Sequence, residues 1–568
     1  MVSSLHRLLR QVSPKFHITT PIFYPNAKPH LGHLYSSLLC DVQARWNKMK
    51  REDVLFTTGT DEHGLKIQLE SEKRGFKDPN MFVDELYPHF VVLNRLANIQ
   101  HTRFIRTTDS DHIANVRKLW NLCNDKGYIY KSKHCGWYSV SDETFYPGSK
   151  VVKLINGEEI PLSGDNSEFD TAIDYINTET RNKVIYQHET NYFFKLSSLK
   201  DALIDLLMEN PGFIFPASKH KQVLSSLKND PLPDLSISRP SSRLQWGIPV
   251  PHDESQCIYV WFDALCNYVS SIGGVDALLS NQPIGHLKHD IEFQHKGATK
   301  EIWTNTTHLV GKDIIKFHTV YWPAILLAAG LPLPNRVVVH GHWLSQGVKM
   351  SKSLGNVVDP LEMIKVYEAD PLRWYLLGNS TIEDDGDFAE TTLSQTRQLL
   401  SSKWGNLIHR CGGTKFNVKR AVRKFYGKSH TSLPILYNNS EIQSLLSKLS
   451  TLVNDLDLMI QNYETANAVR HIWSIINHAN NIVQLGEPWA KPEEEQDLII
   501  YIATEAARIA SIVSQPLIPV LSNVFLDRLD VEAEKRSLDY AVFGADSSYG
   551  SCCNIKGREV PLQRNGKI

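Results

Sequence analysis

The fold is decided near the start of the chain, where residues 16–33 read FHITTPIFYPNAKPHLGH. Their apolar spacing predicts a short strand over residues 16–20 and a helix that begins near His30. Residues 54–58 predict a second strand. A strand, a helix and a strand in this order indicate the β-α-β start of a parallel sheet, and hence an α/β fold.

The turn before the predicted helix carries the motif HLGH, residues 30–33. Free N–H groups at a helix N-terminus attract phosphate, and Gly32 lets a nucleotide base approach the backbone closely. An isolated HxGH also occurs by chance and in small nucleotidylyltransferases. The motif alone therefore indicates phosphate chemistry without defining the reaction.

A second motif, KMSKS at residues 349–353, lies in a glycine-flanked polar loop far downstream. Such a run taken alone is usually a solvated loop, but here it would supply two ammonium groups from a loop that we expect to be flexible when empty. Attack of a carboxylate on the α-phosphate of ATP spreads negative charge over phosphate oxygens, which cations and imidazole N–H groups stabilise. The two motifs in this order indicate an enzyme that adenylates an amino acid.

Further blocks of sequence resemble those of class I methionyl-tRNA synthetases, in that family's order. The resemblance extends over residues 16–530, and it is most specific at GTDEHG, VWFDAL and GKDI. The blocks are residues 21–27 (PIFYPNA), 59–64 (GTDEHG), 235–239 (LSISR), 246–251 (WGIPVP), 260–265 (VWFDAL) and 311–314 (GKDI).

The resemblance implies a class I catalytic domain of the Rossmann type, with a parallel sheet split by an insertion, followed by an all-α anticodon-binding bundle. Residues 235–335 would complete the sheet, and residues 337–340 predict another buried strand. The expected boundaries are 1–15 for a targeting segment, 16–124 and 235–335 for the two halves of the nucleotide-binding fold, 125–234 for the connective insertion, 336–392 for the KMSKS loop and stem-contact region, 393–530 for the helical domain and 531–568 for a C-terminal tail.

Apolar residues recur at helical spacing inside the expected bundle, and no Gly or Pro interrupts residues 436–485. We therefore expect one or two long helices there, with one buried stripe. Whether the tail folds back on the enzyme is left open. The residues of the stripe are Ile442, Leu445, Leu446, Leu449, Leu452, Val453 and Leu456.

The reaction that the resemblance implies is activation of methionine with ATP and Mg²⁺ to methionyl-adenylate, followed by transfer to the 3′-terminal adenosine of tRNA(Met). His30 and His33 would contact the phosphates, Gly32 would lie beneath the adenosine, and the lysines of KMSKS would stabilise the pentacoordinate phosphate. The implied catalytic residues are His30, His33, Lys349 and Lys352, and Gly32 and Ser351 are added as ATP contacts.

Recognition of methionine needs an apolar pocket and one buried charge, for which Asp61 would be the partner of the ammonium group. Trp261 and Tyr268 are ordinary core residues if read without the VWFDAL block, and a lone His318 on an apolar face is more often a core residue than a ligand. Excluding homocysteine by one methyl group is worth only about 1–3 kcal/mol, so proofreading is expected. The implied pocket consists of Ile22, Tyr24, Asp61, Trp261, Ala264, Leu265, Tyr268, Ile314 and His318, with Leu265 at a position where some relatives have proline.

Four residues in the expected bundle, Asn406, Arg410, Pro488 and Trp489, match the family's anticodon-reading elements. A base splayed from its stack can lie on an indole, while Asn and Arg hydrogen-bond its edges. Taken alone, Trp489 could equally serve a structural role at a helix end. The family assignment is the CAU anticodon.

Cysteine usage argues against a metal site. The chain has eight cysteines but no disulfide framework and no CxxC pairs, so a reducing compartment is the default. Many relatives carry zinc knuckles in the insertion, but here residues 136–145 place serine and aspartate at the ligand positions and leave only Cys135 nearby. We therefore expect no zinc and no other bound metal.

The N-terminus resembles a short mitochondrial presequence, because residues 1–16 carry Arg7, Arg10 and Lys15 among apolar residues, and the first 40 residues lack Asp and Glu. A frayed basic terminus is the alternative, so the mitochondrial matrix is expected and the cytoplasm is the second choice.

No apolar run reaches the roughly 20 residues that cross a bilayer. The net charge of −1 means that any tRNA surface must be local, and the lack of an appended dimerisation domain favours a monomer.

Two other functions remain open. One is another class I synthetase, for leucine, isoleucine, valine or cysteine, although the GTDEHG block, the lack of a large editing insertion and the missing zinc ligands argue against these. The other is a non-enzymatic RNA-binding or splicing factor derived from a synthetase, which would tolerate decay of the two motifs. Both motifs are intact.

Overall fold

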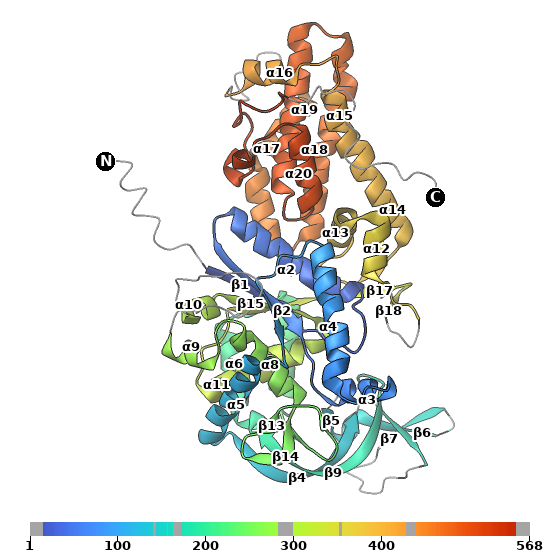
Figure 1. The fold of residues 1–568 in the computed structure, drawn as a ribbon, viewed down its shortest axis with the longest axis vertical. Helices are drawn as coiled ribbons and strands as arrows, with labels where there is room; N and C mark the ends of the chain where they lie inside the picture. Colours follow the sequence, from blue (N-terminus) through green and yellow to red (C-terminus); the bar gives the residue numbers. More distant parts are fainter. Residues whose placement is uncertain are drawn as a thin grey trace.

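The computed structural model describes residues 15–139, 144–155, 157–162, 170, 172–281, 299–350, 355–427 and 439–551. Most of the expected targeting segment, Ser351 and Lys352 of the KMSKS motif, and residues 552–568 therefore lie outside the described residues. Figure 1 shows three layers along the long axis: a helical bundle, a central parallel sheet and a second, curved sheet. None of the described helices is long and apolar enough to span a bilayer.

The central sheet has six strands, which pair in the order β10-β16-β15-β1-β2-β3, and every pairing is parallel. The expected β-α-β start is confirmed, because β1 and β2 pair and helix α2 lies between them in the chain. The strands are β1 (Lys15–Thr19), β2 (Asp53–Thr60), β3 (Arg103–Arg106), β10 (Ile214–Phe215), β15 (Thr306–Gly311) and β16 (Arg336–His340). The accompanying helices are α2 (Leu31–Met49), α3 (Leu65–Lys73), α4 (Pro79–Leu96), α5 (Ser110–Asp125), α8 (Val260–Ser270), α9 (Val275–Ser280), α10 (Thr299–Thr304) and α11 (Trp322–Ala329).

One strand of this sheet was not anticipated. We expected residues 235–335 to complete the sheet, but the edge strand β10 comes from the range 125–234 and pairs with β16. The predicted strand at residues 337–340 is confirmed as β16. A strand of two residues carries no periodic signal, so only its pairing with β16 reveals it.

The insertion forms an antiparallel sheet in the order β5-β4-β9-β8-β6-β7, with β11 also paired to β9. Trp137, Val151, Tyr175 and Val184 form its buried apolar cluster. The strands are β4 (Ile129–Ser139), β5 (Thr144–Tyr146), β6 (Val151–Ile155), β7 (Glu158–Pro161), β8 (Asp174–Asn177), β9 (Lys183–Phe194) and β11 (Leu235–Ser236); helices α6 (Lys200–Glu209) and α7 (Ala217–Asn229) and the 3-10 turns η1 (Gly148–Lys150) and η2 (Leu196–Leu199) belong to the same range.

Two small three-stranded sheets are also present in the described residues, in the orders β12-β14-β13 and β18-β17-β19. The turn Gln346–Gly347 has positive φ at both residues and joins β17 to β18 as a tight hairpin, so part of the expected polar loop is ordered backbone. The elements are β12 (Ser238–Pro240), β13 (Pro249–Val250), β14 (Asp253–Ile258), β17 (Trp343–Ser345), β18 (Val348–Lys349) and β19 (Gly386–Phe388), with the turns η3 (Lys312–Ile314) and η4 (Phe317–Tyr321) between β15 and α11.

The chain is helical from residue 390 to residue 528, apart from short connections and the segment 428–438 outside the described residues. The expected long helices are confirmed as α17 and α18, and the predicted stripe on α17 is buried except for the half-buried Val453. The elements from the KMSKS region onward are α12 (Pro360–Tyr367), α13 (Ala369–Gly378), α14 (Glu390–Leu399), η5 (Leu400–Gly405), α15 (Asn406–Cys411), α16 (Val418–Phe425), α17 (Ser440–Gln461), α18 (Thr465–Gly486), η8 (Pro488–Ala490), α19 (Glu493–Val513) and α20 (Pro519–Arg528).

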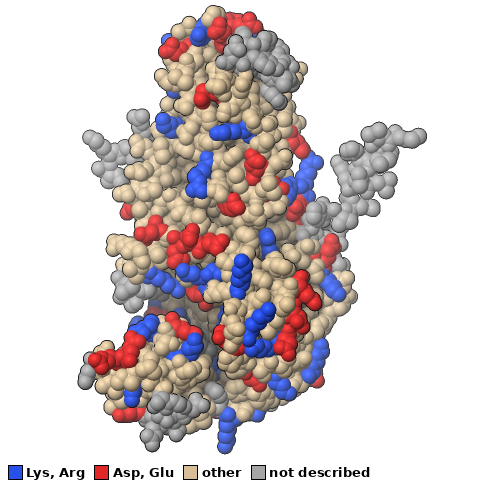
Figure 2. All heavy atoms as spheres, turned by 180° about the vertical axis from the view of Figure 1, so that it is seen from behind, with Lys and Arg blue, Asp and Glu red and all other residues tan. Residues whose placement is uncertain are grey.

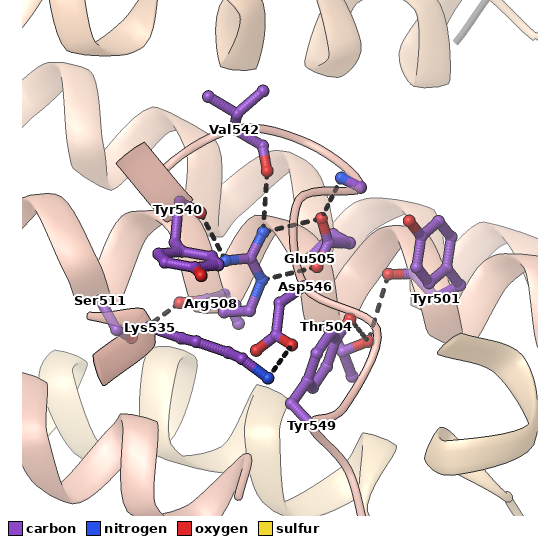
Figure 3. Close-up of polar contacts among 12 residues, drawn as sticks. Tyr501, Thr504, Glu505, Arg508, Ser511, Lys535, Tyr540, Val542, Asp546 and Tyr549 are labelled. Carbon is purple, nitrogen blue, oxygen red and sulfur yellow. Dashed lines mark hydrogen bonds and ion pairs between the residues drawn. The ribbon is translucent and has the colours of Figure 1, made fainter. Parts of the chain in front are cut away.

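Residues 531–551 fold back over α19 and include the turns η9 (Ala533–Lys535) and η10 (Leu538–Tyr540). The buried guanidinium of Arg508 donates to both carboxylate oxygens of Glu505, at 2.6 and 2.9 Å, and to the carbonyl oxygens of Tyr540 and Val542, at 2.6 and 2.9 Å (Figure 3). Gly544 N–H donates to Glu505 as well. This first part of the tail is therefore an integral layer of the helical domain.

Candidate active site

The HLGH turn is held together by its own histidines. His30 caps helix α2, and its Nδ1 accepts a hydrogen bond from Gly32 N–H at 3.0 Å. The Nδ1 of His33 accepts from His30 N–H at 3.0 Å, and the two rings stack with centroids 3.8 Å apart. Because each Nδ1 is an acceptor, each neutral ring carries its proton on Nε2. The turn thus combines two imidazole donors with a positive helix end.

Gly32 is required by this turn itself. A Cβ at Gly32 would lie 2.9 Å from Cε1 of His30, which is closer than real Cβ contacts. Any side chain at this position would therefore displace the capping ring. The sequence-based reason for Gly32, close approach of a nucleotide, is not tested by this geometry.

Lys349 of the KMSKS motif ends strand β18, and its Nζ lies 3.2 Å from Oδ2 of Asp313. The other oxygen of Asp313 lies 3.2 Å from Nε2 of His342. Burial alone would raise the pKa of Asp313, but His342 and Lys349 together hold that pKa below its ordinary value. Met350 is buried in the main core and anchors the start of the motif, while Ser351 and Lys352 lie outside the described residues.

The two motifs lie at the same edge of the central sheet. HLGH follows β1 and the KMSKS hairpin follows β16, and both strands pair with β15 in parallel. A direct contact joins the two segments, since Oγ of Ser36 in α2 lies 2.9 Å from Nε2 of His340 at the end of β16. The carboxyl ends of parallel strands are where α/β folds place their ligands.

A second anchor holds the KMSKS hairpin in place, and the sequence did not reveal it. Nζ of Lys312 lies 2.7 Å from both oxygens of Asp385, and Asp385 also accepts from His342 N–H at 2.8 Å. A Cβ at Gly341 would lie 2.3 Å from the carbonyl oxygen of Asp384, so the two backbones touch there. Residues 384–388 thus position the hairpin.

Asp61 follows strand β2 and is 2 % exposed. The next residue, Glu62, is also buried and accepts from Arg106 Nε at 2.8 Å and from Thr108 Oγ1 at 2.6 Å. Glu62 and Arg106 were not among the predicted site residues, although Glu62 stands inside GTDEHG. Together they fix the backbone that carries Asp61.

The expected methionine pocket is assembled around His318. Its Nδ1–H donates to the carbonyl oxygen of Ile314 at 2.9 Å, and its Nε2 accepts from the hydroxyl of Tyr268 at 2.6 Å. Burial lowers the pKa of His318 to about 4, so the ring is neutral at physiological pH. Trp261 stacks on Phe317 with centroids 3.7 Å apart.

Of the other predicted pocket residues, Ala264 and Leu265 lie on α8, whereas Ile22 and Tyr24 lie between β1 and α2. Leu265 and Tyr268 belong to a buried cluster against which Tyr24, Trp261 and Ile314 pack. Ala264 is buried on α8, and Ile22 is half-buried before the bridge between Phe23 and Thr60. A cavity next to GTDEHG and VWFDAL is lined by Gly64, Tyr138, Arg239, Val260 and neighbouring residues, and none of the predicted pocket residues is in its lining. In Figure 2 a cleft separates the lobe of the insertion sheet from the rest, with Lys and Arg side chains above and below it.

Two of the expected anticodon-reading residues, Arg410 of α15 and Trp489 of η8, lie side by side in the helical domain. The guanidinium carbon of Arg410 lies 6.0 Å from the ring centroid of Trp489. Trp489 is 44 % exposed, whereas Pro488 is buried and Asn406 is half-buried at the start of α15. An exposed indole beside a cation is suited to stacking with a base.

The described ranges offer no cluster of metal ligands, because no group of three or more His, Cys, Asp and Glu side chains within them could hold a metal ion. Cys135 of strand β4 is exposed, and its Sγ lies 2.8 Å from Nδ1 of His188. Of residues 136–145, which contain the expected ligand positions of zinc-binding relatives, 140–143 are outside the described part of the chain.

Comparison with known proteins agrees with this geometry. A family model for class I tRNA synthetases (M) matches residues 16–412. The mitochondrial methionine–tRNA ligase of Saccharomyces cerevisiae is 55 % identical, over 99 % of this chain and 97 % of its own, and that of Xenopus laevis is 38 % identical, over 95 % and 90 %. The structure of Mycobacterium tuberculosis methionyl-tRNA synthetase in complex with methionyl-adenylate is similar, with a TM-score of 0.81, 29 % identity, and coverage of 97 % of this chain and 100 % of that one.

The resemblance noted in the sequence is therefore confirmed at three levels: family model, full-length relatives and fold. The class I architecture, with its parallel sheet and a helical domain after it, is confirmed as well. The curated relatives named above are mitochondrial forms. The chain belongs to the methionine–tRNA ligase family of class I tRNA synthetases.

Proposed function

We propose that the chain activates methionine with MgATP and transfers it to tRNA(Met) in the mitochondrial matrix. One observation carries the proposal: Ser36 and His340, 2.9 Å apart, join the helix that bears HLGH to the strand that leads to KMSKS. The two motifs thus form one phosphate-binding edge rather than two separate loops. Methionyl-adenylate bound to the similar M. tuberculosis enzyme supports methionine and ATP as substrates here.

The activation step needs only positioned charge. The carboxylate of methionine attacks the α-phosphorus, the bond to pyrophosphate breaks, and methionyl-adenylate remains bound. The Nε2–H groups of His30 and His33 would donate to phosphate oxygens, and Lys349 and Lys352 would neutralise the charge that develops there. Before substrate binds, Asp313 pairs with Lys349 and keeps its ammonium group at this edge.

The methionine pocket uses neutral groups around one buried charge. Asp61 would pair with the ammonium group, and the neutral His318 and Tyr268 would present a polarity suited to a thioether without a second charge. The apolar face of α8 would surround the side chain. Proofreading against homocysteine remains part of the proposal, because a pocket of this kind discriminates one methyl group by only about 1–3 kcal/mol.

The tRNA would be read by the helical domain and charged at the sheet edge. Arg410 and Trp489 would engage the CAU anticodon together with Asn406 and Pro488, and the terminal adenosine hydroxyl would attack the carbonyl of the adenylate, giving methionyl-tRNA and AMP. We propose the domain boundaries given from the sequence, except that β10 belongs to the central sheet and residues 531–551 belong to the helical domain, together with a zinc-free insertion and a monomeric enzyme. The N-terminal segment would direct the chain to mitochondria.

The proposal is tested by ATP–pyrophosphate exchange on the purified protein, with methionine, leucine, isoleucine, valine and cysteine as separate substrates. Exchange with methionine alone is the expected result. The double variant Lys349→Ala, Lys352→Ala should lose about two orders of magnitude or more in rate. Lys228→Ala, at an exposed position on α7, is the control and should leave the rate unchanged. Exchange with a different amino acid, or with none, would contradict the proposal.

A further inference from the structure

A buried carboxylate, Asp263, lies on helix α8 between two histidines from distant parts of the chain. Its Oδ2 accepts from Nδ1 of His63 and its Oδ1 accepts from Nε2 of His112, both at 2.7 Å. The side chains of Asp263 and His112 are 1 % and 0 % exposed, and that of His63 is 7 % exposed. Each carboxylate oxygen therefore has one imidazole donor in a dry environment.

The side chain of His112 contacts α8 at two residues, Asp263 and Ser270. While its Nε2 donates to Asp263, its Nδ1 lies 3.1 Å from the hydroxyl of Ser270, which is the donor to a neutral ring. Asp263 and Ser270 are seven residues apart, so they lie on the same face of the helix. Helix α5, which carries His112, thereby fixes the rotation of α8 about its axis.

The opposite face of α8 is the wall of the proposed methionine pocket. Trp261, Ala264, Leu265 and Tyr268 follow the helical period and lie away from Asp263. If α8 rotated because its contacts with His112 were lost, these four side chains would move with it. The contacts of Asp263 and Ser270 on one face of α8 thus set the position of the pocket residues on its other face.

The other histidine, His63, belongs to the loop that carries Asp61, the proposed partner of the methionine ammonium group. His63 stands two residues after Asp61, and the intervening Glu62 is tied to Arg106 and Thr108 on the side of β3. The loop is therefore held from two directions, by Glu62 toward β3 and by His63 toward α8. Asp61 directly precedes these two anchored residues in the loop.

We propose that Asp263 is a positioning residue for methionine, which holds the Asp61 loop and the apolar wall of α8 at a fixed separation through His63 and His112. This role rests on the proposed function. Burial would raise the pKa of Asp263, but the two imidazoles hold it below the ordinary value, so the carboxylate stays an acceptor for both. Asp263 needs no contact with the substrate to act in this way.

The variants separate positioning from general support of the fold. In Asp263→Asn only one oxygen remains as acceptor, so one imidazole loses its partner, and KM for methionine should rise about tenfold or more while KM for ATP changes by less than about twofold. His112→Gln keeps an N–H donor toward Asp263 and should stay near wild type, whereas His112→Leu should behave like Asp263→Asn. Asp276→Asn, an exposed aspartate on the neighbouring α9, is the matched control.

The measurement is ATP–pyrophosphate exchange with methionine varied at saturating ATP, then ATP varied at saturating methionine, with the melting temperature of each variant. Equal changes in both KM values, an unchanged KM for methionine, or equal impairment of His112→Gln and His112→Leu would overturn the role. If Asp263→Asn does not fold, the two His112 variants decide. A wild-type protein that catalyses no methionine-dependent exchange would instead contradict the proposed function itself.

Discussion

Arg373 of α13 and Asp41 of α2 form a buried ion pair, with 2.7 Å between Nη2 and Oδ2, where the catalytic domain meets the helical bundle. The same guanidinium donates to the carbonyl oxygens of Leu517 at 2.8 Å, Pro516 at 2.8 Å and Ala97 at 3.0 Å. Helix α2 carries HLGH at its N-terminal end. Arg373 therefore links the helix that would bind ATP to Leu517 and Pro516 of the bundle that would read the anticodon.

Replacing Arg373 by methionine should destabilise the enzyme strongly. Asp41 would stay buried and would keep its pair with Arg45, 2.7 Å away, but would lose the fully buried guanidinium of Arg373, and breaking a buried pair costs about 3–5 kcal/mol. The control is Arg51→Met, because Arg51 pairs with Asp539 on the surface, where such a pair contributes about 0–1 kcal/mol. Thermal unfolding followed by circular dichroism compares the two, and equal melting temperatures would refute the role of the junction.

Gly32→Ala should inactivate the HLGH turn without unfolding the protein. The new Cβ would push the His30 ring from its cap, since only 2.9 Å would separate this methyl carbon from Cε1 of the ring. We expect the exchange rate to fall about a hundredfold. Gly212→Ala is the matched control, because nothing lies within 4 Å of a Cβ there. Normal exchange by Gly32→Ala would show that the cap is dispensable.

Asp370→Asn should stabilise the protein at neutral and alkaline pH. Burial raises the pKa of Asp370 to about 6, although Arg373 and the N–H of Leu521 oppose the shift. A raised carboxyl pKa means that folding is favoured most below the unfolded pKa, near 3.9, and that stability is lost as pH rises through 6. Asparagine keeps an acceptor for Leu521 N–H, 2.6 Å away, without the charge.

The gain from Asp370→Asn should therefore be about 1–3 kcal/mol at pH 8 and clearly smaller at pH 5, where the wild-type carboxyl is mostly protonated. Melting temperatures of both proteins across this pH range provide the check. A variant that is less stable at every pH, or a difference that does not depend on pH, would show that the ionised carboxylate is well accommodated.

Trp489→Ala should separate the two steps of the reaction. The side chain is 44 % exposed, so little core packing is lost, and methionine activation should be unchanged. Loss of one stacked base costs about 1–3 kcal/mol, which lowers kcat/KM for tRNA about ten- to a hundredfold. Met208→Ala, at another exposed apolar position, is the control. A fall in activation equal to the fall in charging would contradict an anticodon role.

Helices and strands with a clear local pattern of apolar residues could be predicted from the sequence. The start of α2 near His30 was predictable from the spacing of apolar residues, and α17 was predictable because seven apolar residues follow one stripe. Strand β10 could not be predicted, because two residues carry no period and its pairing partner β16 lies far along the chain.

The partners in the buried polar network around the site could not be predicted from the sequence, for a different reason. Asp263 and Glu62 stand inside recognisable blocks, yet nothing local shows that His112 or Arg106 would complete them. Asp41 looks like a surface residue of an amphipathic helix until Arg373 covers it. Such partners are chosen by the tertiary arrangement, and burial makes each pairing obligatory.

The most direct test of the account is charging of tRNA by the purified protein with labelled methionine and MgATP. Mitochondrial tRNA(Met) should accept methionine, a transcript with an altered CAU anticodon should accept far less, and no charging should occur with leucine, isoleucine, valine or cysteine on their own tRNAs. Stable attachment of one of those amino acids, or binding of tRNA(Met) with no charging at all, would contradict the central claim.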